Sequence, residues 1–209
     1  MEVLIADDHM VVREGLKQII RNLENINRID EASRGDEAWE KIKKGNYDLV
    51  ILDLSMPGMN GLDVLKKIKD HNLKIHVLIL SIYPQEHYAV RAFNLGASGY
   101  VSKDSLYEEL ALAIKKIAAG GRYITSAFAE KIAFEGHGSD TRKPHDTLSE
   151  REFQVLIMLA RGNSVTEISN KILVSDKTVS TYRARILDKM RLKNNTEITL
   201  YAVRNNLIE

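Results

Sequence analysis

The sequence contains no cysteine, no long apolar run and no strong excess of either charge. Without cysteine, the chain cannot form a disulfide framework, a zinc–thiolate site or a cysteine nucleophile. No apolar run approaches the roughly 18 residues that a membrane-spanning helix needs. The apolar run Val3–Ala6 has no basic segment before it, so it is typical of a first strand and not of a signal peptide. These absences favour a cytoplasmic protein without a membrane partner.

The chain has an ordinary globular composition, with 209 residues, 44% hydrophobic and 28% charged, and this length is enough for two small domains. Its charge is unevenly distributed. Residues 1–120 hold 16 Lys and Arg against 18 Asp and Glu, a net charge of −2, whereas residues 121–209 hold 14 against 11, a net charge of +3. The segment 174–204 alone holds 7 against 3. Positive charge gathered near the end favours a polyanionic partner for the C-terminal part.

Short apolar runs alternate with amphipathic stretches over residues 1–120. The apolar runs have the length and density of strands covered on both faces, and they are Val3–Ala6, Ile26–Ala32, Leu49–Leu52, Ile75–Leu80 and Ala97–Val101. Between them, apolar residues recur at helical spacing, as at Leu110, Ile114 and Ile117. This alternation predicts an α/β domain with a doubly wound, five-stranded parallel sheet.

The last third of the sequence has a different organisation. Residues 121–146 are polar and rich in turn residues, which predicts a linker that contains one short helix at about Ser126–Phe134. Residues 147–209 show only helical patterns and predict a small all-α domain. Its first helix starts with a capping box, in which Ser149 is the N-cap and Glu152 stands three residues later.

Five chemically active side chains follow the predicted strands of the first domain. Asp7 and Asp8 end the first strand, Asp53 ends the third, Ser81 ends the fourth, and Lys103 follows the fifth. In an open parallel sheet, functional residues gather at the carboxyl ends of the strands. We therefore expect three carboxylates, a hydroxyl and an ammonium group to meet at one edge.

Three carboxylates at one edge repel one another and favour a bound cation. A like-charged pair about 4 Å apart costs about 4 kcal/mol at an effective dielectric near 20. Oxygen-only ligands suit Mg²⁺ better than Zn²⁺, and an aspartate can act as a nucleophile towards phosphorus. A single Asp at a strand end is more often a helix cap or turn residue, so the inference depends on the joint arrangement. His9 is interpreted as a loop or helix-start residue and not as a metal ligand.

The interpretation of the first domain depends on one run of residues, Asp53-Leu54-Ser55-Met56-Pro57-Gly58-Met59-Asn60-Gly61. Together with Asp7, Asp8, Ser81 and Lys103, it closely resembles the receiver domains of two-component response regulators, which have a flavodoxin-like (CheY-like) fold. Asp104 follows Lys103 where many receivers have proline, which leaves the shape of this loop open.

The resemblance implies a role for each residue of this edge. Asp53 would accept a phosphoryl group from a sensor histidine kinase. The side chains of Asp8 and Asp53 and the backbone carbonyl of Ser55 would bind Mg²⁺, and Asp7 would hold a metal-bound water. The phosphoryl group and the conformational switch would involve Ser81, Tyr100 and Lys103.

The last domain carries the pattern helix, tight turn, helix. The two helices are Val165–Ile172 and a segment from Asp176 to about Met190. The N-cap of the second helix is Ser175 or Asp176. Flanking motifs such as Leu148-Ser149-Glu150-Arg151-Glu152 and Thr178-Val179-Ser180 resemble LuxR-type helix-turn-helix domains. The whole chain thus resembles NarL/FixJ-type response regulators, in which the last helix, here Asn195–Asn206, is often used for dimerisation.

The second helix is expected to be the DNA-recognition helix. Its exposed face mixes small polar groups and cations, which suits base edges flanked by phosphates. Ser180, Thr181 and Ala184 are expected to face bases, and the expected phosphate contacts are Lys177, Arg183, Arg185 and Lys189. Ser180 stands where many relatives have lysine, so the operator sequence cannot be carried over.

The leading hypothesis is a phosphorylation-switched transcription regulator that is not an enzyme. Its partners would be double-stranded promoter DNA, a histidine kinase, a second copy in a homodimer and, further, RNA polymerase. One alternative is a Mg²⁺-dependent phosphohydrolase, although Ser55 stands where related hydrolases have a second catalytic aspartate. Another alternative is a DNA-binding protein whose receiver serves only as a constitutive dimerisation module.

Overall fold

A computed structural model gives the structure of the chain, and it describes residues 1–82, 85–125, 128–129, 143–205 and 207–208. The chain divides into two compact units, residues 1–138 and 139–209. The predicted helix at Ser126–Phe134 lies mostly outside the described residues, and so does most of the predicted linker. The predicted domain boundaries at 120 and 147 stay predictions.

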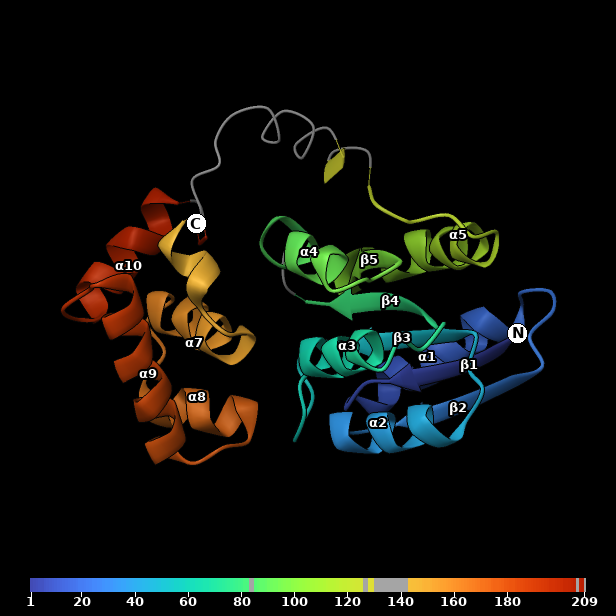
Figure 1. Ribbon diagram of the computed structural model, residues 1–209, viewed down its shortest axis with the longest axis horizontal. Helices are drawn as coiled ribbons and strands as arrows, with labels where there is room; N and C mark the ends of the chain where they lie inside the picture. The colour runs from blue at the N-terminus through green and yellow to red at the C-terminus, as the bar shows by residue number, and fades with distance from the viewer. Residues whose placement is uncertain (83–84, 126–127, 130–142, 206, 209) are drawn as a thin grey trace. The chain divides into compact units, whose positions relative to one another are not determined.

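The first unit is a five-stranded parallel sheet with helices on both faces (Figure 1). The strand order is β2-β1-β3-β4-β5, and all neighbouring strands are parallel. The elements are β1 (Glu2–Ala6), α1 (Met10–Arg21), β2 (Arg28–Ala32), α2 (Gly35–Lys44), β3 (Leu49–Asp53), α3 (Gly61–Asp70), β4 (His76–Ser81), α4 (Gln85–Asn94), β5 (Gly99–Ser102), a 3₁₀ turn η1 (Lys103–Ser105) and α5 (Leu106–Ala118). The predicted fold class and all five predicted strands are confirmed.

The first unit has an apolar core between the sheet and the helices α1 and α5. Strand residues such as Ile5 and Ile51 pack there against Leu16 of α1 and against Leu110 and Ile114 of α5. The central strand β3 is buried along its whole length, as expected for a strand covered on both faces. Each buried aliphatic side chain contributes about 1.5–3 kcal/mol of transfer free energy.

Tyr123, which the prediction assigned to the linker, packs in the core of the first unit. Its ring is 7% exposed, and its hydroxyl donates a hydrogen bond to Glu109 on α5 at 3.0 Å. Its backbone lies beside β5, with a hydrogen bond from its N–H to the Ser98 carbonyl at 2.9 Å and one from the Tyr100 N–H to its own carbonyl at 3.3 Å. The segment after α5 is therefore tied to the edge of the sheet next to β5.

Within the described residues, the second unit is entirely helical. Its elements are a 3₁₀ turn η2 (Pro144–Thr147), α7 (Glu150–Ala160), α8 (Val165–Ile172), α9 (Asp176–Met190) and α10 (Asn195–Arg204). The predicted capping box at Ser149 and Glu152 is present, and a second one at Ser164 and Glu167 starts α8. Each cap supplies acceptors for backbone N–H groups that have no partner within the helix.

Candidate functional sites

The carboxyl edge of the sheet gathers the predicted pocket residues. Asp7 follows β1, Asp53 ends β3 and Ser81 ends β4, and each of these side chains is at most 1% exposed. Lys103 opens the 3₁₀ turn after β5, and its side chain is 11% exposed. Asp8 is partly exposed at 27%. The structure thus brings together groups that the sequence separates by almost 100 residues.

Lys103 is the positive charge of this pocket. Its Nζ donates a hydrogen bond to Asp53 Oδ2 at 3.0 Å. It also lies 2.7 Å from Asp7 Oδ2, an ionic contact that lacks the alignment of a hydrogen bond. Burial alone would lower the pKa of Lys103, but the Asp53 and Asp7 carboxylates outweigh burial and raise it. Lys103 therefore stays charged and offsets part of the carboxylate repulsion.

The surroundings of Asp53 shift the pKa of its carboxyl group. Burial raises the pKa of Asp53 to about 6, the positive charge of Lys103 opposes this shift, and the negative charge of Asp7 adds to it. At neutral pH this carboxyl is therefore still mostly ionised. A buried but ionised carboxylate is poorly solvated, which suits a nucleophile that accepts an electrophilic group.

The loop after β3 is held against the Asp53 backbone. The Ser55 N–H donates to Asp53 Oδ1 at 3.2 Å, and the Gly61 N–H donates to the Leu54 carbonyl at 3.1 Å. A Cβ at Gly61 would lie 2.2 Å from the Asp53 carbonyl oxygen, so only glycine allows this approach. Asn60 then caps α3 by accepting from the Asp63 N–H. The loop thereby fixes the direction of the Asp53 carboxylate.

Ser81 and Tyr100 stand on the neighbouring strands β4 and β5, and both are 0% exposed. The resemblance gives both residues a part in the conformational switch, and the structure places both side chains in the interior on adjacent strands.

The acidic edge has a donor set that fits a divalent cation. One ligand atom from each of Asp7, Asp8, His9 and Asp53 lies within 4.8 Å of the others. Asp7 Oδ2 and Asp8 Oδ1 are buried oxygens that accept no hydrogen bond in the described structure. Close, poorly neutralised carboxylate oxygens are the ligands that Mg²⁺ prefers. The residues present therefore fit the cation that the fold family implies.

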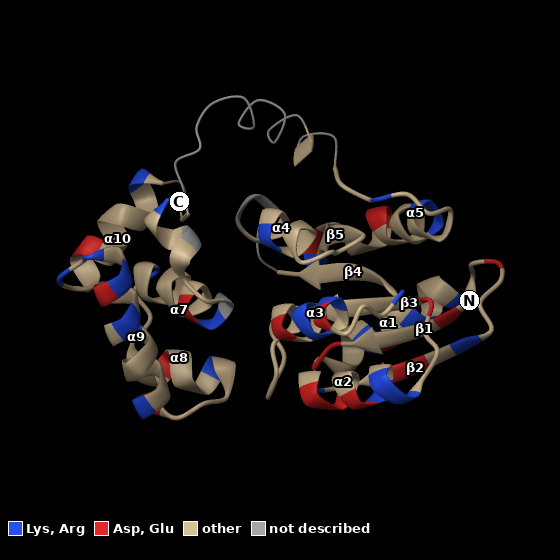
Figure 2. Cartoon of the chain, in the orientation of Figure 1, with Lys and Arg blue, Asp and Glu red and all other residues tan. Residues whose placement is uncertain are grey.

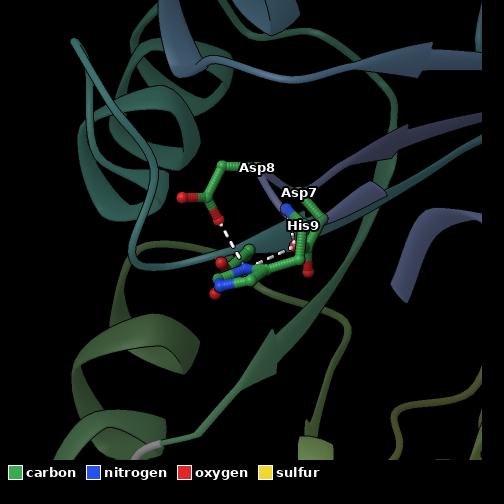
Figure 3. A group of neighbouring side chains, drawn as sticks. Asp7, Asp8 and His9 are labelled. Carbon is green, nitrogen blue, oxygen red and sulfur yellow. Dashed lines mark hydrogen bonds and ion pairs between the residues drawn. The ribbon is translucent and has the colours of Figure 1, made fainter. Parts of the chain in front are cut away.

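His9 combines its expected position with a contact that the sequence did not reveal. As expected, it stands at the start of a helix, at the N-cap position of α1. Its ring also turns towards the acidic edge, with Nδ1 2.7 Å from Asp8 Oδ1 and 3.3 Å from Asp7 Oδ1 (Figure 3). The adjacency of Asp7, Asp8 and His9 in the chain was the only signal for this contact.

Helices α8 and α9 form the predicted helix-turn-helix. Ser175 is the N-cap of α9 and accepts a hydrogen bond from the Thr178 N–H. Asp176, in the first turn of α9, accepts hydrogen bonds from Ser169 Oγ and, at 2.8 Å, from Thr166 Oγ1, both on α8. These bonds lower the pKa of Asp176, the one from Ser169 most strongly. The charged bridge fixes the angle between the two helices.

Most predicted DNA contacts lie at exposed positions of α9, and Figure 2 marks the Lys and Arg positions of this helix in blue on the ribbon. The exposed members are Lys177, Ser180, Thr181, Ala184, Arg185 and Lys189. The buried face of the helix is formed by Val179, Ile186 and Met190, and Leu187 is partly buried. The structure thus separates a core face of α9 from its solvent face.

Two of the predicted phosphate contacts have partners inside the domain. Arg183 is partly buried, and its Nε donates to Asn195 Oδ1 on α10 at 2.7 Å. Lys189 Nζ donates to Glu152 Oε2 on α7 at 2.6 Å, and the Glu152 side chain is 3% exposed. Burial raises the pKa of Glu152, but Lys189 and the Ser149 N–H outweigh this and lower it. Both cations therefore tie α9 to its neighbours.

Comparison with known families assigns both units. A family model of the response regulator receiver domain matches residues 3–115, and a model of the LuxR family of bacterial regulatory proteins matches residues 146–202. The chain belongs to the NarL/FixJ-type two-component response regulators. In this response regulator, the acidic edge lies in the receiver match and α9 lies in the LuxR match.

Similar proteins match along almost the whole response regulator. Response regulator UvrY of Escherichia coli (strain K12) is 34% identical over 208 residues, covering 99% of this chain and 95% of that protein. Response regulator GacA of Pseudomonas aeruginosa is 32% identical over 210 residues, covering 100% and 98%. A solved structure of RcsB from Salmonella enterica serovar Typhimurium, bound to the promoter rprA with the phosphomimetic BeF₃⁻, has a TM-score of 0.64 at 28% identity and covers 96% and 98%.

Within the described residues, this response regulator has no helix that is both long enough and apolar enough to span a membrane.

Proposed function

We propose that Asp53 accepts a phosphoryl group from a sensor histidine kinase and that this modification controls promoter binding by α9. The observation that carries the proposal is the buried, ionised Asp53 carboxylate beside Lys103, in one chain with a LuxR-type helix-turn-helix. An Asp53 oxygen forms the new bond to phosphorus while the bond from phosphorus to the kinase histidine breaks. The product is an acyl phosphate on Asp53 and a free kinase histidine.

The residues around Asp53 prepare it for this transfer. Lys103 already pairs with Asp53 and would stay paired with one oxygen of the bound phosphoryl group. Ser81, at the end of the adjacent strand β4, would hydrogen-bond another oxygen and move towards it, and Tyr100 would turn inward as Ser81 moves. Burial of Asp53 and Ser81 limits access of water to the acyl phosphate.

A Mg²⁺ ion would complete this pocket. Asp8, Asp53 and the Ser55 carbonyl would hold it directly, and Asp7 would hold it through water. When bound, the ion supplies positive charge that offsets the carboxylates and the incoming phosphoryl oxygens. The chain would hydrolyse its own phosphoryl group slowly and would not turn over small phosphate esters.

The second unit would read promoter DNA with α9. Its solvent face offers Ser180, Thr181 and Ala184 to base edges, and Lys177 and Arg185 to phosphates. A homodimer would present two recognition helices to half-sites about one DNA turn apart. RcsB, a relative, has been solved on promoter DNA, which supports this part of the proposal. RNA polymerase and a cytoplasmic location fit such a regulator.

Intact-mass measurement tests the proposal most simply. The full chain is incubated with Mg²⁺ and acetyl phosphate, alongside Asp53→Asn. We expect one added phosphoryl group on the unmodified chain and none on the variant. Equal labelling of both proteins would overturn the assignment of Asp53. Size-exclusion chromatography of the same samples reports whether phosphorylation favours the dimer.

A further inference from the structure

The His9 ring lies beside the acidic edge and has a ligand atom directed at it (Figure 3). Nδ1 lies 2.7 Å from Asp8 Oδ1 and 3.3 Å from Asp7 Oδ1. The Asp7 carboxylate also anchors the His9 backbone, because the His9 N–H donates to Asp7 Oδ1 at 2.8 Å. The position of the ring at this edge is therefore set by the backbone as well as by the side chain.

The rest of the site supplies oxygen atoms in need of positive charge. Asp7 is 1% exposed, and its Oδ2 accepts no hydrogen bond in the described structure. The ionic contact with Lys103 offsets the negative charge at this oxygen. Asp8 Oδ1 is likewise a buried oxygen. The ligand atoms of Asp7, Asp8, Asp53 and His9 all lie within 4.8 Å of one another. One cation can therefore be reached by three carboxylates and an imidazole.

We propose that His9 gives the cation site of this receiver a nitrogen ligand and thereby widens its metal selectivity. The proposal rests on the proposed function, since the same carboxylates hold the cation in both. Mg²⁺ is a hard cation that takes oxygen ligands, whereas Co²⁺, Ni²⁺ and Zn²⁺ readily take imidazole nitrogen. The mixed donor set therefore binds these three cations more tightly than an all-oxygen set would.

Two states of the His9 ring account for this selectivity. Beside Mg²⁺, a ring protonated on Nδ1 would keep its contacts with the Asp7 and Asp8 carboxylates and would stay outside the ligand set. Beside Co²⁺, a ring protonated on Nε2 would offer its Nδ1 lone pair as a ligand. The side chain of His9 is 64% exposed, so it changes state without disturbing the core.

Isothermal titration calorimetry of the tag-free full chain tests the proposal with Mg²⁺ and Co²⁺ alone as probes. His9→Asn keeps an N–H donor near the position of Nδ1 but removes the imidazole lone pair. His76→Asn is the matched control, because His76 is an exposed histidine at the opposite end of β4 from Ser81. Asp53→Asn tests the cation site itself.

We expect His9→Asn to weaken Co²⁺ binding by at least about tenfold, since loss of even an outer-shell partner costs roughly 10–100-fold. Mg²⁺ binding should stay nearly unchanged in this variant, and His76→Asn should affect neither cation. If His9→Asn changes the two affinities by the same factor, or changes neither, the nitrogen ligand is refuted. If Asp53→Asn leaves both affinities unchanged, the cation site of the proposed function fails with it.

Discussion

The acidic edge and the recognition helix place their functional groups in opposite ways. Asp7, Asp53 and Ser81 are buried where three strands end, so their positions are fixed by the sheet. Lys177 and Arg185 stand on the solvent face of one helix, where both are exposed. A buried site is therefore set by the fold, whereas an exposed surface leaves its residues free to match a partner.

The two regions also differ in how their charges are balanced. In the pocket, Lys103 lies between two carboxylates of the same site. On α9, the cations Arg183 and Lys189 contact residues of α10 and α7. Basic charge on a recognition helix thus includes structural cations, which charge counting along the sequence does not separate from DNA contacts.

The largest expected effect concerns Tyr123, which packs in the core of the first unit. Tyr123→Ala should lower the free energy of unfolding of the receiver by about 3–5 kcal/mol, because it removes a buried aromatic ring. Urea denaturation followed by circular dichroism measures this change. Tyr107→Ala is the control, since Tyr107 is 77% exposed and should change stability by less than about 0.5 kcal/mol. Equal losses in both variants would contradict the account.

A smaller effect separates structural from DNA-binding cations. Lys189→Gln should destabilise the second domain by about 1–3 kcal/mol, because it leaves the buried Glu152 carboxylate without its ionic partner. Lys177→Gln, on the same helix but exposed, should leave stability unchanged. Thermal unfolding of the two variants makes the comparison, and unchanged stability of Lys189→Gln would refute the structural role.

The loss of stability in Lys189→Gln should depend on pH. Lys189 helps to lower the folded-state pKa of Glu152 below its usual 4.5. The ion pair therefore stabilises the domain above about pH 4.5, and this contribution is lost as the pH falls through the lowered pKa. The stability difference between the unmodified chain and Lys189→Gln should shrink towards pH 3. A difference that grows on acidification would contradict this assignment.

The two cations should exchange roles in DNA affinity, because Lys177, whose loss should leave stability unchanged, is expected to contribute to binding. Lys177→Gln and Arg185→Gln should each weaken binding and reduce the slope of log affinity against log salt by about 1, because each would remove one phosphate contact. Fluorescence anisotropy with a promoter fragment at several salt concentrations measures both effects. A salt slope that changes in Lys189→Gln but not in Lys177→Gln would reverse our division of the cations.

The smallest expected effect concerns the turn before α9. Leu173 is 63% exposed and has a φ of 55°, a left-handed conformation that is costly for a leucine. Leu173→Asn should raise the stability of the domain by about 0.5–1 kcal/mol, since asparagine adopts this conformation more readily. Leu173→Ala keeps the Cβ and serves as the control without a gain. Chemical denaturation would contradict the argument if both variants behaved alike.

Much of this molecule could be predicted from its sequence because the signals are local. Short apolar runs gave all five strands, and their carboxyl ends placed Asp7, Asp53 and Ser81 at one edge. Ser149 with Glu152 gave the start of α7. These features depend on residues close together in the chain or on a rule for parallel sheets.

The features that escaped prediction depend on contacts between distant segments. Nothing near Lys189 in the sequence reveals that Glu152, 37 residues earlier, is its partner. Tyr123 followed a Gly-Gly pair and suggested a linker, but tertiary packing placed its ring in the core.

Control of DNA binding by α9 through phosphorylation of Asp53 is the central proposal for this response regulator. The direct test is the DNA affinity of the full chain, measured by fluorescence anisotropy with and without acetyl phosphate and Mg²⁺, beside Asp53→Asn. The account predicts that phosphorylation changes the affinity of the unmodified chain and leaves that of Asp53→Asn unchanged. Equal affinities in all four samples, with phosphorylation of the unmodified chain verified by mass, would contradict the claim and leave the receiver as a constitutive dimerisation module.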